Sequence, residues 1–527
     1  MTHSFHPGRR TTRLSTALSA TLAAILPGVA MAEVSPQDVW DQWQSYMSGF
    51  GYEMTASPVA EGGNLRIPTF SMTMPMPAAP EADAPAGEIT LTMGEIGLID
   101  RGDGSVGIEM PARMPIILSG EGTEEDDFSI KATLTTEGYS TIATGTPEDI
   151  SYDLSAVRIG MTVDEFTGKK GPVATPGTVA MTMEGAKGTS RLGTVAGSTT
   201  IEQSFDLVKL IYTVDITNPQ PDKPGHFKAS GTIDGLSSTG RGVLPDGFDP
   251  ANLSAALDAG YLVDGAMRYV SGQGQTEFED PEQSFKIATS SEGGTFRVAM
   301  SSAGLAYDVL SRNLTLNLES SEMPFPVATS MTAFGLGVDV PVSATEEAQP
   351  FNASLTLTDL VVPDMIWMMA DPTNSLPHDP LTAEVDLSGK GRLFVDLTDE
   401  AAMSQLGKTG GNPGEVDSLS IDSFVLKAAG ATIDASADFA IDNEAVSVFN
   451  PAMPAIAGTA DLRLTGVMGL INKLGQMGLI PGPQAMMTAG MIQQLGKIES
   501  GPDDVSAKIE LSQEGAVTIN GNALPLR

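Results

Sequence analysis

The strongest constraint in this sequence is an alternation of apolar and polar residues that recurs along much of its length. Clear examples are Ile89-Thr90-Leu91-Thr92-Met93 and the runs 351–358, 381–387 and 505–511. Alternation with period two places apolar side chains on one face of a strand and polar side chains on the other, solvent-exposed face, as in antiparallel sheets. Among 57 glycines and 35 prolines, many separate these runs. The sequence therefore predicts a mainly β protein with long, curved antiparallel sheets and a few amphipathic helices.

Three glycine-containing segments have the composition of hairpin turns. Residues 290–294 separate the runs 285–289 and 295–300, and residues 513–515 separate the last two runs. Arg101-Gly102-Asp103-Gly104 contains the tripeptide of integrin ligands, but its Asp-Gly pair is ordinary turn chemistry. We therefore expect each segment to join two neighbouring strands.

Short segments with helical signals interrupt the strands. Ser35 is a suitable N-cap and Pro36 fits the first turn of an N-terminal helix. Its apolar stripe comprises Val39, Trp40, Trp43, Met47 and Phe50. Further helices are predicted from Asp249 to Gly260, Asp364 to Ala370, Thr398 to Leu406, Val467 to Met477 and Gln484 to Leu495, the last two forming a C-terminal Met-rich pair. The order strand, helix, returning strand occurs at 351–387 and again at 458–511, which is compatible with duplication or with a common local arrangement.

The first 32 residues have the features of a secretory signal peptide. Arg9, Arg10 and Arg13 precede an apolar region, and Ala30-Met31-Ala32 supplies the small residues at a cleavage site between Ala32 and Glu33. The sequence contains no cysteine, which a bacterial lipoprotein anchor requires, and no later segment reaches about 18 consecutive apolar residues. We therefore expect an exported periplasmic protein with no lipoprotein anchor and no transmembrane segment.

A proline-rich segment, 218–225, marks the best candidate domain boundary. It separates an N-terminal β-rich domain, residues 33–217, from a C-terminal β-rich domain, residues 226–527, that carries the Met-rich helices. The alternative is one continuous sheet that runs through both halves.

The charge of the chain argues against several classes of partner and reaction. The formal net charge is −37, and removal of residues 1–32 would lower it to −40. This charge repels phosphate backbones and anionic head groups, so we expect no nucleic acid partner. The predicted mature chain has only His226 and His378, too few for the usual zinc sites. Residues 402–409 meet a relaxed phosphate-loop spacing but close a predicted helix instead of opening one. The sequence indicates no catalytic residue, cofactor or metal site.

Methionine is the residue type that most suggests binding. The chain has 27 methionines, some of them grouped within the predicted helices. Methionine side chains adapt to varied apolar shapes, although they also fill cores. The candidate groove-lining residues are Met365, Trp367, Met368, Met369, Met468, Met477, Met486, Met487 and Met491.

The C-terminal part of the chain resembles a known family. The strand 458–466, the apolar helix that ends at Met477-Gly478-Leu479-Ile480-Pro481 and the closing strand 517–521 are similar to the alphaproteobacterial exported family called domain of unknown function 2125. A more distant similarity links the alternating strands and amphipathic helix to AsmA-like envelope proteins. The resemblance implies a Gram-negative envelope address, and the AsmA-like similarity implies lipid handling. It implies no catalytic residue.

These observations leave three functional hypotheses. The first is a non-enzymatic protein that binds a hydrophobic ligand such as a lipid, or an envelope partner. It predicts apolar residues on both faces of some strands, or a cavity beside the Met-rich helices. The second is a carboxylate-dependent hydrolase of envelope polymers, which predicts two carboxylates about 5–10 Å apart in a cleft. The third is a structural or assembly factor without ligand, which predicts that the Met-rich helices are buried.

Overall fold

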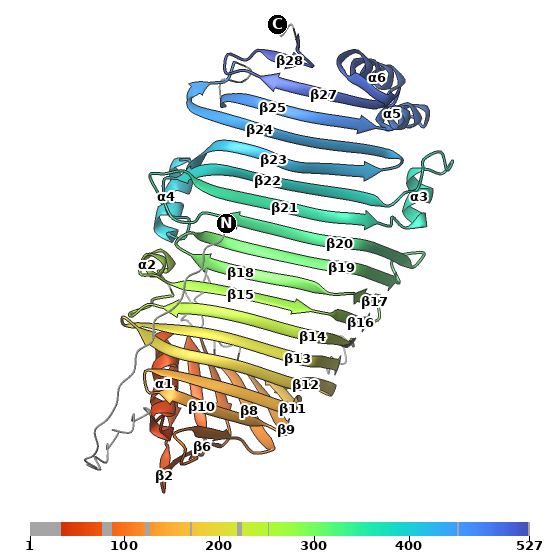
Figure 1. Ribbon diagram of the computed structural model, residues 1–527. Coiled ribbons are helices and arrows are strands. Elements are labelled where there is room, and N and C mark those ends of the chain that lie inside the picture. Colours follow the sequence, from red (N-terminus) through yellow and green to blue (C-terminus); the bar gives the residue numbers. More distant parts are fainter. Residues whose placement is uncertain are drawn as a thin grey trace, which may run out of the picture.

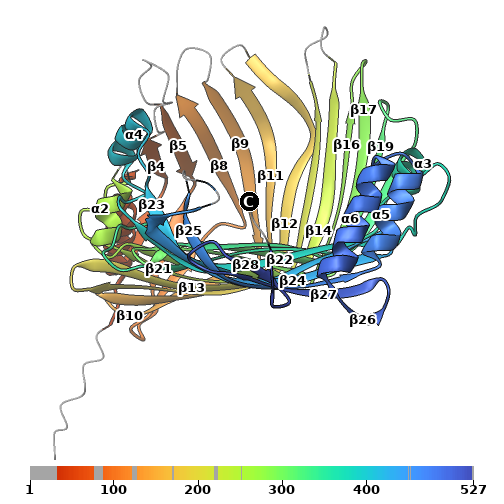
Figure 2. The same cartoon turned by 90° about the horizontal axis from the view of Figure 1, so that it is seen from above.

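A single antiparallel sheet organises the whole described part of the chain. The computed structural model describes residues 33–75, 87–121, 127–168, 171–218, 224–250, 252–448, 450 and 453–524. All 29 strands belong to one sheet. Figure 1 shows them stacked in near sequence order, and Figure 2 shows the sheet wrapped into a trough. The prediction of a mainly β fold with long, curved antiparallel sheets is confirmed.

The strands fall into three groups along the stack. The N-terminal group comprises β1 (Glu53–Ala56), β2 (Val59–Glu61), β3 (Asn64–Ile67), β4 (Phe70–Pro75), β5 (Glu88–Met93), β6 (Ile96–Asp100), β7 (Val106–Glu109), β8 (Arg113–Glu121), β9 (Phe128–Glu137) and β10 (Ser140–Thr146). The central group comprises β11 (Asp149–Gly168), β12 (Gly171–Val195), β13 (Ser198–Thr217), β14 (His226–Leu244), β15 (Leu262–Tyr269), β16 (Ser271–Glu279), β17 (Ser284–Ser291), β18 (Gly294–Ser301), β19 (Gly304–Ser320) and β20 (Val327–Val340). The C-terminal group comprises β21 (Gln349–Leu360), β22 (Leu381–Leu393), β23 (Gly414–Ala428), β24 (Ala431–Val446), β25 (Pro454–Thr465), β26 (Lys497–Gly501), β27 (Asp504–Leu511), β28 (Val517–Ile519) and β29 (Asn522–Ala523).

The sheet divides into two branches at its N-terminal end. The first part of β11 pairs with β10, and the branch continues through β7, β6 and β3 to β2. The second part of β11 pairs with β9, and that branch continues through β8, β5 and β4 to β1. Helix α1 (Pro36–Gly49) contacts strands of both branches.

The bend that forms the trough follows a row of alternating glycine and valine residues. Gly185 in β12 and Gly235 in β14 have φ angles of 62° and 60°. A Cβ at Gly185 would lie 2.6 Å from Cγ2 of Val208, and a Cβ at Gly235 would lie 2.6 Å from Cγ2 of Val270. Glycine is favoured at these points because it adopts a left-handed backbone without steric cost and leaves room for the neighbouring valine.

The alternation of side chains shifts phase at this bend. Ala156, Ala186 and Leu207 are buried in one small cluster, and Ile159, Met183 and Leu210, each three positions away, pack against the same cluster. Two consecutive residues of each strand therefore face outward, as in a β-bulge. Both arms of a bent strand consequently keep their apolar residues on the same side.

Opposite charges accompany the bend on its outer side. The glycines follow acidic residues, and the facing valines of β11 and β13 precede basic residues. Arg158 lies 3.3 Å from both Glu137 and Glu184, and Lys209 lies 3.2 Å from Asp234. These pairs are exposed, so we expect each to add little to stability.

The predicted hairpin at residues 290–294 is wrong. β17 and β18 do not pair with each other; both pair with β19, one beyond the other along its length. Gly293, with φ 99°, therefore marks the bend of one long strand. β15 and β16 lie in the same way along β14. The turns predicted at 101–104 and 513–515 do join the paired strands β6–β7 and β27–β28.

The six helices of the described chain follow the predicted segments closely. Ser35 caps α1 in a capping box with Asp38, and Val39 and Trp40 are buried. The remaining helices are α2 (Leu253–Asp258), α3 (Asp364–Ala370), α4 (Glu400–Thr409), α5 (Val467–Gln476) and α6 (Gly482–Leu495). Three predicted starts are wrong: Asn252 caps α2, Asp399 caps α4 instead of Thr398, and α6 begins at Gly482, two residues before Gln484. Figures 1 and 2 show α2 and α4 at one rim of the trough and α3, α5 and α6 at the other.

The candidate domain boundary lies where two neighbouring strands pair. β13 and β14 are aligned from Thr199 opposite Leu244 to Thr217 opposite His226, on either side of the proline-rich segment. The strands before and after the proline-rich segment are therefore neighbours in one sheet, while residue 222 itself lies outside the described residues. The predicted signal peptide and Ala32 also lie outside the described residues; Val34, two residues later, is buried.

Alanine at the bend glycines tests this account of the trough. We expect Gly185→Ala and Gly235→Ala each to lower the free energy of unfolding by about 1–2 kcal/mol, because each forces a residue with a Cβ into the left-handed region. The measurement is the urea midpoint. Gly265→Ala is the matched control, since its Cβ would meet no atom within 4 Å. Equal shifts in all three variants would contradict the role of the bend.

Candidate functional site

One face of the sheet is largely apolar from β11 to β27. Strand register aligns one residue from each of fourteen neighbouring strands in a single row on this face. The row contains no charged residue and comprises Leu154, Gly188, Phe205, Ser238, Met267, Phe296, Val309, Leu336, Leu355, Val385, Phe424, Ala435, Leu462 and Ala507. We call the surface that carries this row the apolar face.

The opposite face, one residue along each strand, is polar. The neighbouring row runs through Asp153, Thr189, Ser204, Thr239, Ala266, Arg297, Asp308, Gly337, Ser354, Asp386 and Ser423. Ion pairs such as Arg241–Asp264, at 3.1 Å, cross the strands on this side. The sheet therefore has one face suited to water and one suited to apolar contact.

The apolar face is the concave face of the trough. At the bend, Val157, Val208 and Val270 on the polar side are 60–68% exposed, whereas Ala156 and Leu207 on the apolar side are buried. Side chains spread apart on the convex side of a bent sheet and crowd on the concave side. The interior of the trough in Figure 2 is thus lined by the apolar row.

Much of this lining is uncovered in the middle of the sheet. Six large apolar residues of the face are each 37–40% exposed: Val263, Met267, Tyr307, Phe334, Leu336 and Leu355. They lie on β15, β19, β20 and β21, where strand register places them on the same side as the apolar row. A contiguous exposed apolar area of this kind marks an interaction surface.

The N-terminal end of the trough is closed by a packed core. Trp40 and Val39 of α1 are buried with residues of both the first branch and β11, including Leu98 and Ile150. The hydroxyl of Tyr152 donates to Oε1 of Gln42 at 2.7 Å, and Nε2 of Gln42 donates to the carbonyl of Leu192 at 3.1 Å. Burial raises the pKa of Tyr152, so this hydroxyl remains a donor at neutral pH. These contacts fix α1 against the end of the apolar face.

The Met-rich residues predicted from sequence divide into two groups. Met468 is buried, and Met365, Trp367 and Met477 are half-buried. The remaining five are 52–80% exposed: Met368, Met369, Met486, Met487 and Met491. The hypothesis of a purely structural role predicts that these helices are buried. The structure differs: α3 has no buried residue, and Ala485 is the one buried residue of α6.

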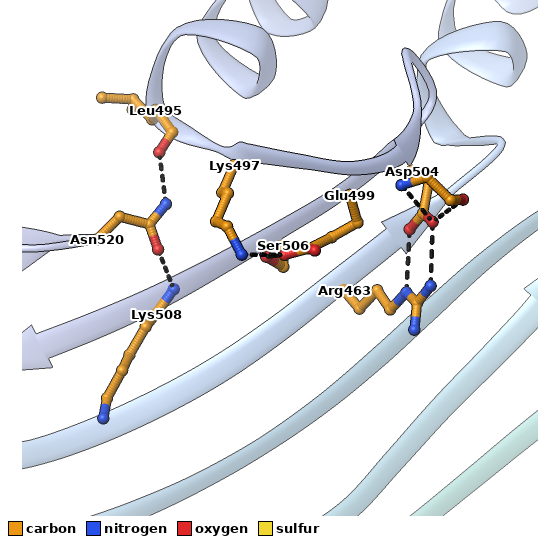
Figure 3. Close-up of polar contacts among 9 residues, drawn as sticks. Arg463, Leu495, Lys497, Glu499, Asp504, Ser506, Lys508 and Asn520 are labelled. Atoms are coloured by element: carbon orange, nitrogen blue, oxygen red, sulfur yellow. Dashed lines mark hydrogen bonds and ion pairs between the residues drawn. The ribbon is translucent and has the colours of Figure 1, made fainter.

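Two polar residues anchor the α5–α6 hairpin to the sheet. Both carboxylate oxygens of Asp503 accept hydrogen bonds at the start of α5, from the N–H groups of Met468 and Gly469 at 2.9 and 2.8 Å. At the end of α6, the Asn520 amide donates to the Leu495 carbonyl at 3.0 Å and accepts from the Lys508 N–H at 2.9 Å (Figure 3). Both ends of the hairpin are thus fixed.

A polar cluster fixes the loop after α3. The ring of His378 stacks on Trp367 with centroids 4.3 Å apart, and its Nε2 lies 3.7 Å from the buried Asp371. Burial opposes ionisation of Asp371, but the N–H groups of Leu376 and Ser375 hold its pKa below the usual value. The second histidine, His226, lies 2.8 Å from Asp215. Each histidine therefore lies within 4 Å of one carboxylate.

Carboxylates line hollows on the polar face of the sheet. A hollow of about 540 Å³ includes Asp422, Asp434 and Asp461 in its lining. The described carboxyl groups with a clear shift lie outside this hollow, and hydrogen bonds or neighbouring cations lower the pKa of each. Within the described ranges, no group of three or more His, Cys, Asp or Glu residues could hold a metal ion.

The exposed residues of β15 and β19–β21 were not identified from sequence. Each sits in an alternating run, which predicts a strand with one apolar face but does not show whether a second layer covers that face. One available signal was the shift in alternation phase, for example Phe205 and Leu207 followed by Leu210 and Tyr212. That shift indicates a bent strand whose concave side is apolar.

Removal of the Asp503 carboxylate tests the anchoring of α5. We expect Asp503→Ala to lower the stability of the hairpin by about 1 kcal/mol, because two helix N–H groups lose their acceptor. Hydrogen exchange of the amides at 468–470 should accelerate. Asp461→Ala on the polar face is the control, and acceleration of the same amides there would argue against a specific cap.

The pair formed by Arg463 and Asp504 predicts a dependence on pH. The two bonds from Arg463 are 3.0 Å long, and with Ser500 they hold the pKa of Asp504 far below its usual value. A lowered pKa in the folded state stabilises the fold above the unfolded pKa of about 4, and the effect is lost as pH falls toward the folded pKa. The stability difference between the native chain and Arg463→Gln should be constant above about pH 5 and shrink below pH 4. A constant difference down to pH 2.5 would contradict this role.

No protein-family model matches the chain, and no curated protein matches it. Among the described residues, no helix has the length and apolar character needed to cross a membrane.

Proposed function

We propose that this protein binds a long apolar ligand, such as the acyl chains of a lipid, along the concave apolar face. The observation that carries this proposal is the row of fourteen aligned residues without a charge, together with the 37–40% exposure of six large apolar residues beside or within it. A non-enzymatic role follows naturally, because such a surface offers contact area and no reactive group.

The size of the ligand follows from the energy of burial. Covering the exposed part of one such side chain contributes about 1 kcal/mol, and six of them therefore contribute about 6 kcal/mol. Association costs at least about 4 kcal/mol in lost motion. A short apolar molecule that touches two or three of these residues would not stay bound. The ligand must extend over several strands, as a lipid chain does.

The closed N-terminal end favours storage or carriage over passage. A ligand that moves along the apolar face meets the packed core of α1 beyond β11, where Val39, Leu98 and Ile150 are fully buried. Opening this end would expose that core and break the Tyr152–Gln42 contact. Ligand would therefore enter from the open side or the C-terminal end.

We also propose a periplasmic address and membership of the exported family that the C-terminal segment resembles. Residues 1–32 have the composition of a signal peptide, which supports export.

Polar substitution on the apolar face tests ligand binding. We expect the native chain to bind a fluorescent long-chain fatty acid, and Leu336→Asp/Leu355→Asp to weaken binding at least about tenfold, because the bound ligand would bury two carboxylates that have no partner. The measurement is a fluorescence titration, together with native mass spectrometry of lipid carried through purification.

Asn352→Glu is the matched control for this experiment. Asn352 lies on β21, is exposed and faces the polar side. It should leave fatty acid binding unchanged. Absence of binding in the native chain, or equal loss in both variants, would show that the apolar face is not the ligand site.

A further inference from the structure

A second apolar surface lies outside the trough lining, on the helices of one rim. We call it the helical rim, and it consists of exposed residues of α3, α5–α6 and the turn between them. Six of its residues are 52–80% exposed: Met368, Met369, Leu479, Met486, Met487 and Met491. Helices that are apolar all round are normally buried. α6 has no charged residue, yet it buries little of its surface.

The parts of the helical rim are held next to one another. Gly430 lies in the turn between β23 and β24, and Pro377 follows α3. A Cβ added at Gly430 would lie 2.9 Å from Cγ of Pro377. An added Cβ at Gly466, the residue that precedes α5, would lie 2.2 Å from the carbonyl of the same Gly430. Figures 1 and 2 show α3, α5 and α6 along the same side of the sheet. The exposed methionines therefore belong to one rim.

The charge of the α5–α6 part of this rim differs from that of the rest of the chain, whereas α3 carries Asp364 in its first turn. No acidic residue occurs between Asp461 and Glu499, although the whole chain carries 66 acidic residues and a net charge of −37. Lys473 is the one charged residue within α5 and α6. This segment can approach a surface without bringing a carboxylate into contact with it.

We propose that the helical rim docks on a lipid membrane surface. A second copy of the chain is a poorer occupant than a lipid surface without net charge, because two bodies that each carry −37 repel each other. Flexible, unbranched methionine side chains fit a fluid acyl boundary without fixed complementarity. Asp503 and Asn520 hold both ends of the hairpin, so the methionines are presented by a fixed support.

Vesicle flotation tests this docking surface with the full chain. The probe is a phosphatidylcholine vesicle, which has no net charge and so isolates the apolar contribution. We expect the native chain to float with vesicles, and Met486→Asp/Met487→Asp to reduce the bound fraction at least about tenfold, because the aspartates would have to enter the interface. Val208→Asp/Val270→Asp is the matched control, since these valines are equally exposed on the convex side. Circular dichroism and urea midpoints establish that each variant is folded.

Any of three results would overturn the proposal. The first is that the native chain does not float with vesicles, and the second is that the control variant loses as much binding as the rim variant. The third is that the rim variant dissociates an oligomer while its vesicle binding stays unchanged. The trough variant Leu336→Asp/Leu355→Asp separates this proposal from ligand binding. It should keep vesicle binding while it loses the fatty acid, so either proposal can fail alone.

Discussion

The structure depends on keeping one alternation in phase across many strands. A shift of one residue in any strand would move its apolar side chains to the polar face. The row from Leu154 to Ala507 shows that fourteen strands avoid this shift, although bulges occur within several of them. The antiparallel pairing satisfies the backbone, while the shared phase produces two chemically distinct faces. A single layer can then be folded without a second sheet to cover it, because few of its residues depend on full burial.

The bend converts this two-faced sheet into a trough. A flat sheet would leave its whole apolar face open to solvent. The glycine and valine row lets two successive residues of a strand face outward, and both arms then keep the apolar face inside. The same device crowds Ala156, Ala186 and Leu207 into a small core along the fold line. The two alanines suit this position, since larger side chains there would hold the arms apart.

The sequence permits prediction of most elements, but not of their arrangement. Period-two runs identify strands because burial on one face requires that pattern, and Ser35-Pro36 identifies the start of α1 through local hydrogen bonds alone. Gly293 shows the limit: a glycine with positive φ serves a hairpin or a strand bend equally well, and which strand pairs with β17 is decided by residues far away. The methionines of α3 and α6 were identified as an unusual group, but their exposure depends on the absence of a covering layer, which no local pattern records. The residues of β15 and β19–β21 were missed for the same reason.

The two ends of the trough are built by opposite physical means. At the N-terminal end, large aromatic and branched side chains of α1 pack between two branches of the sheet, and Gln42 joins the helix to β11 and β12. At the C-terminal end, the α5–α6 hairpin is held chiefly at its termini by Asp503 and Asn520, so its middle contributes little to the core. A helix held at its ends can expose apolar residues without loosening, whereas a helix held by its apolar face cannot. The first arrangement seals the apolar face, and the second leaves an apolar surface beside its open end.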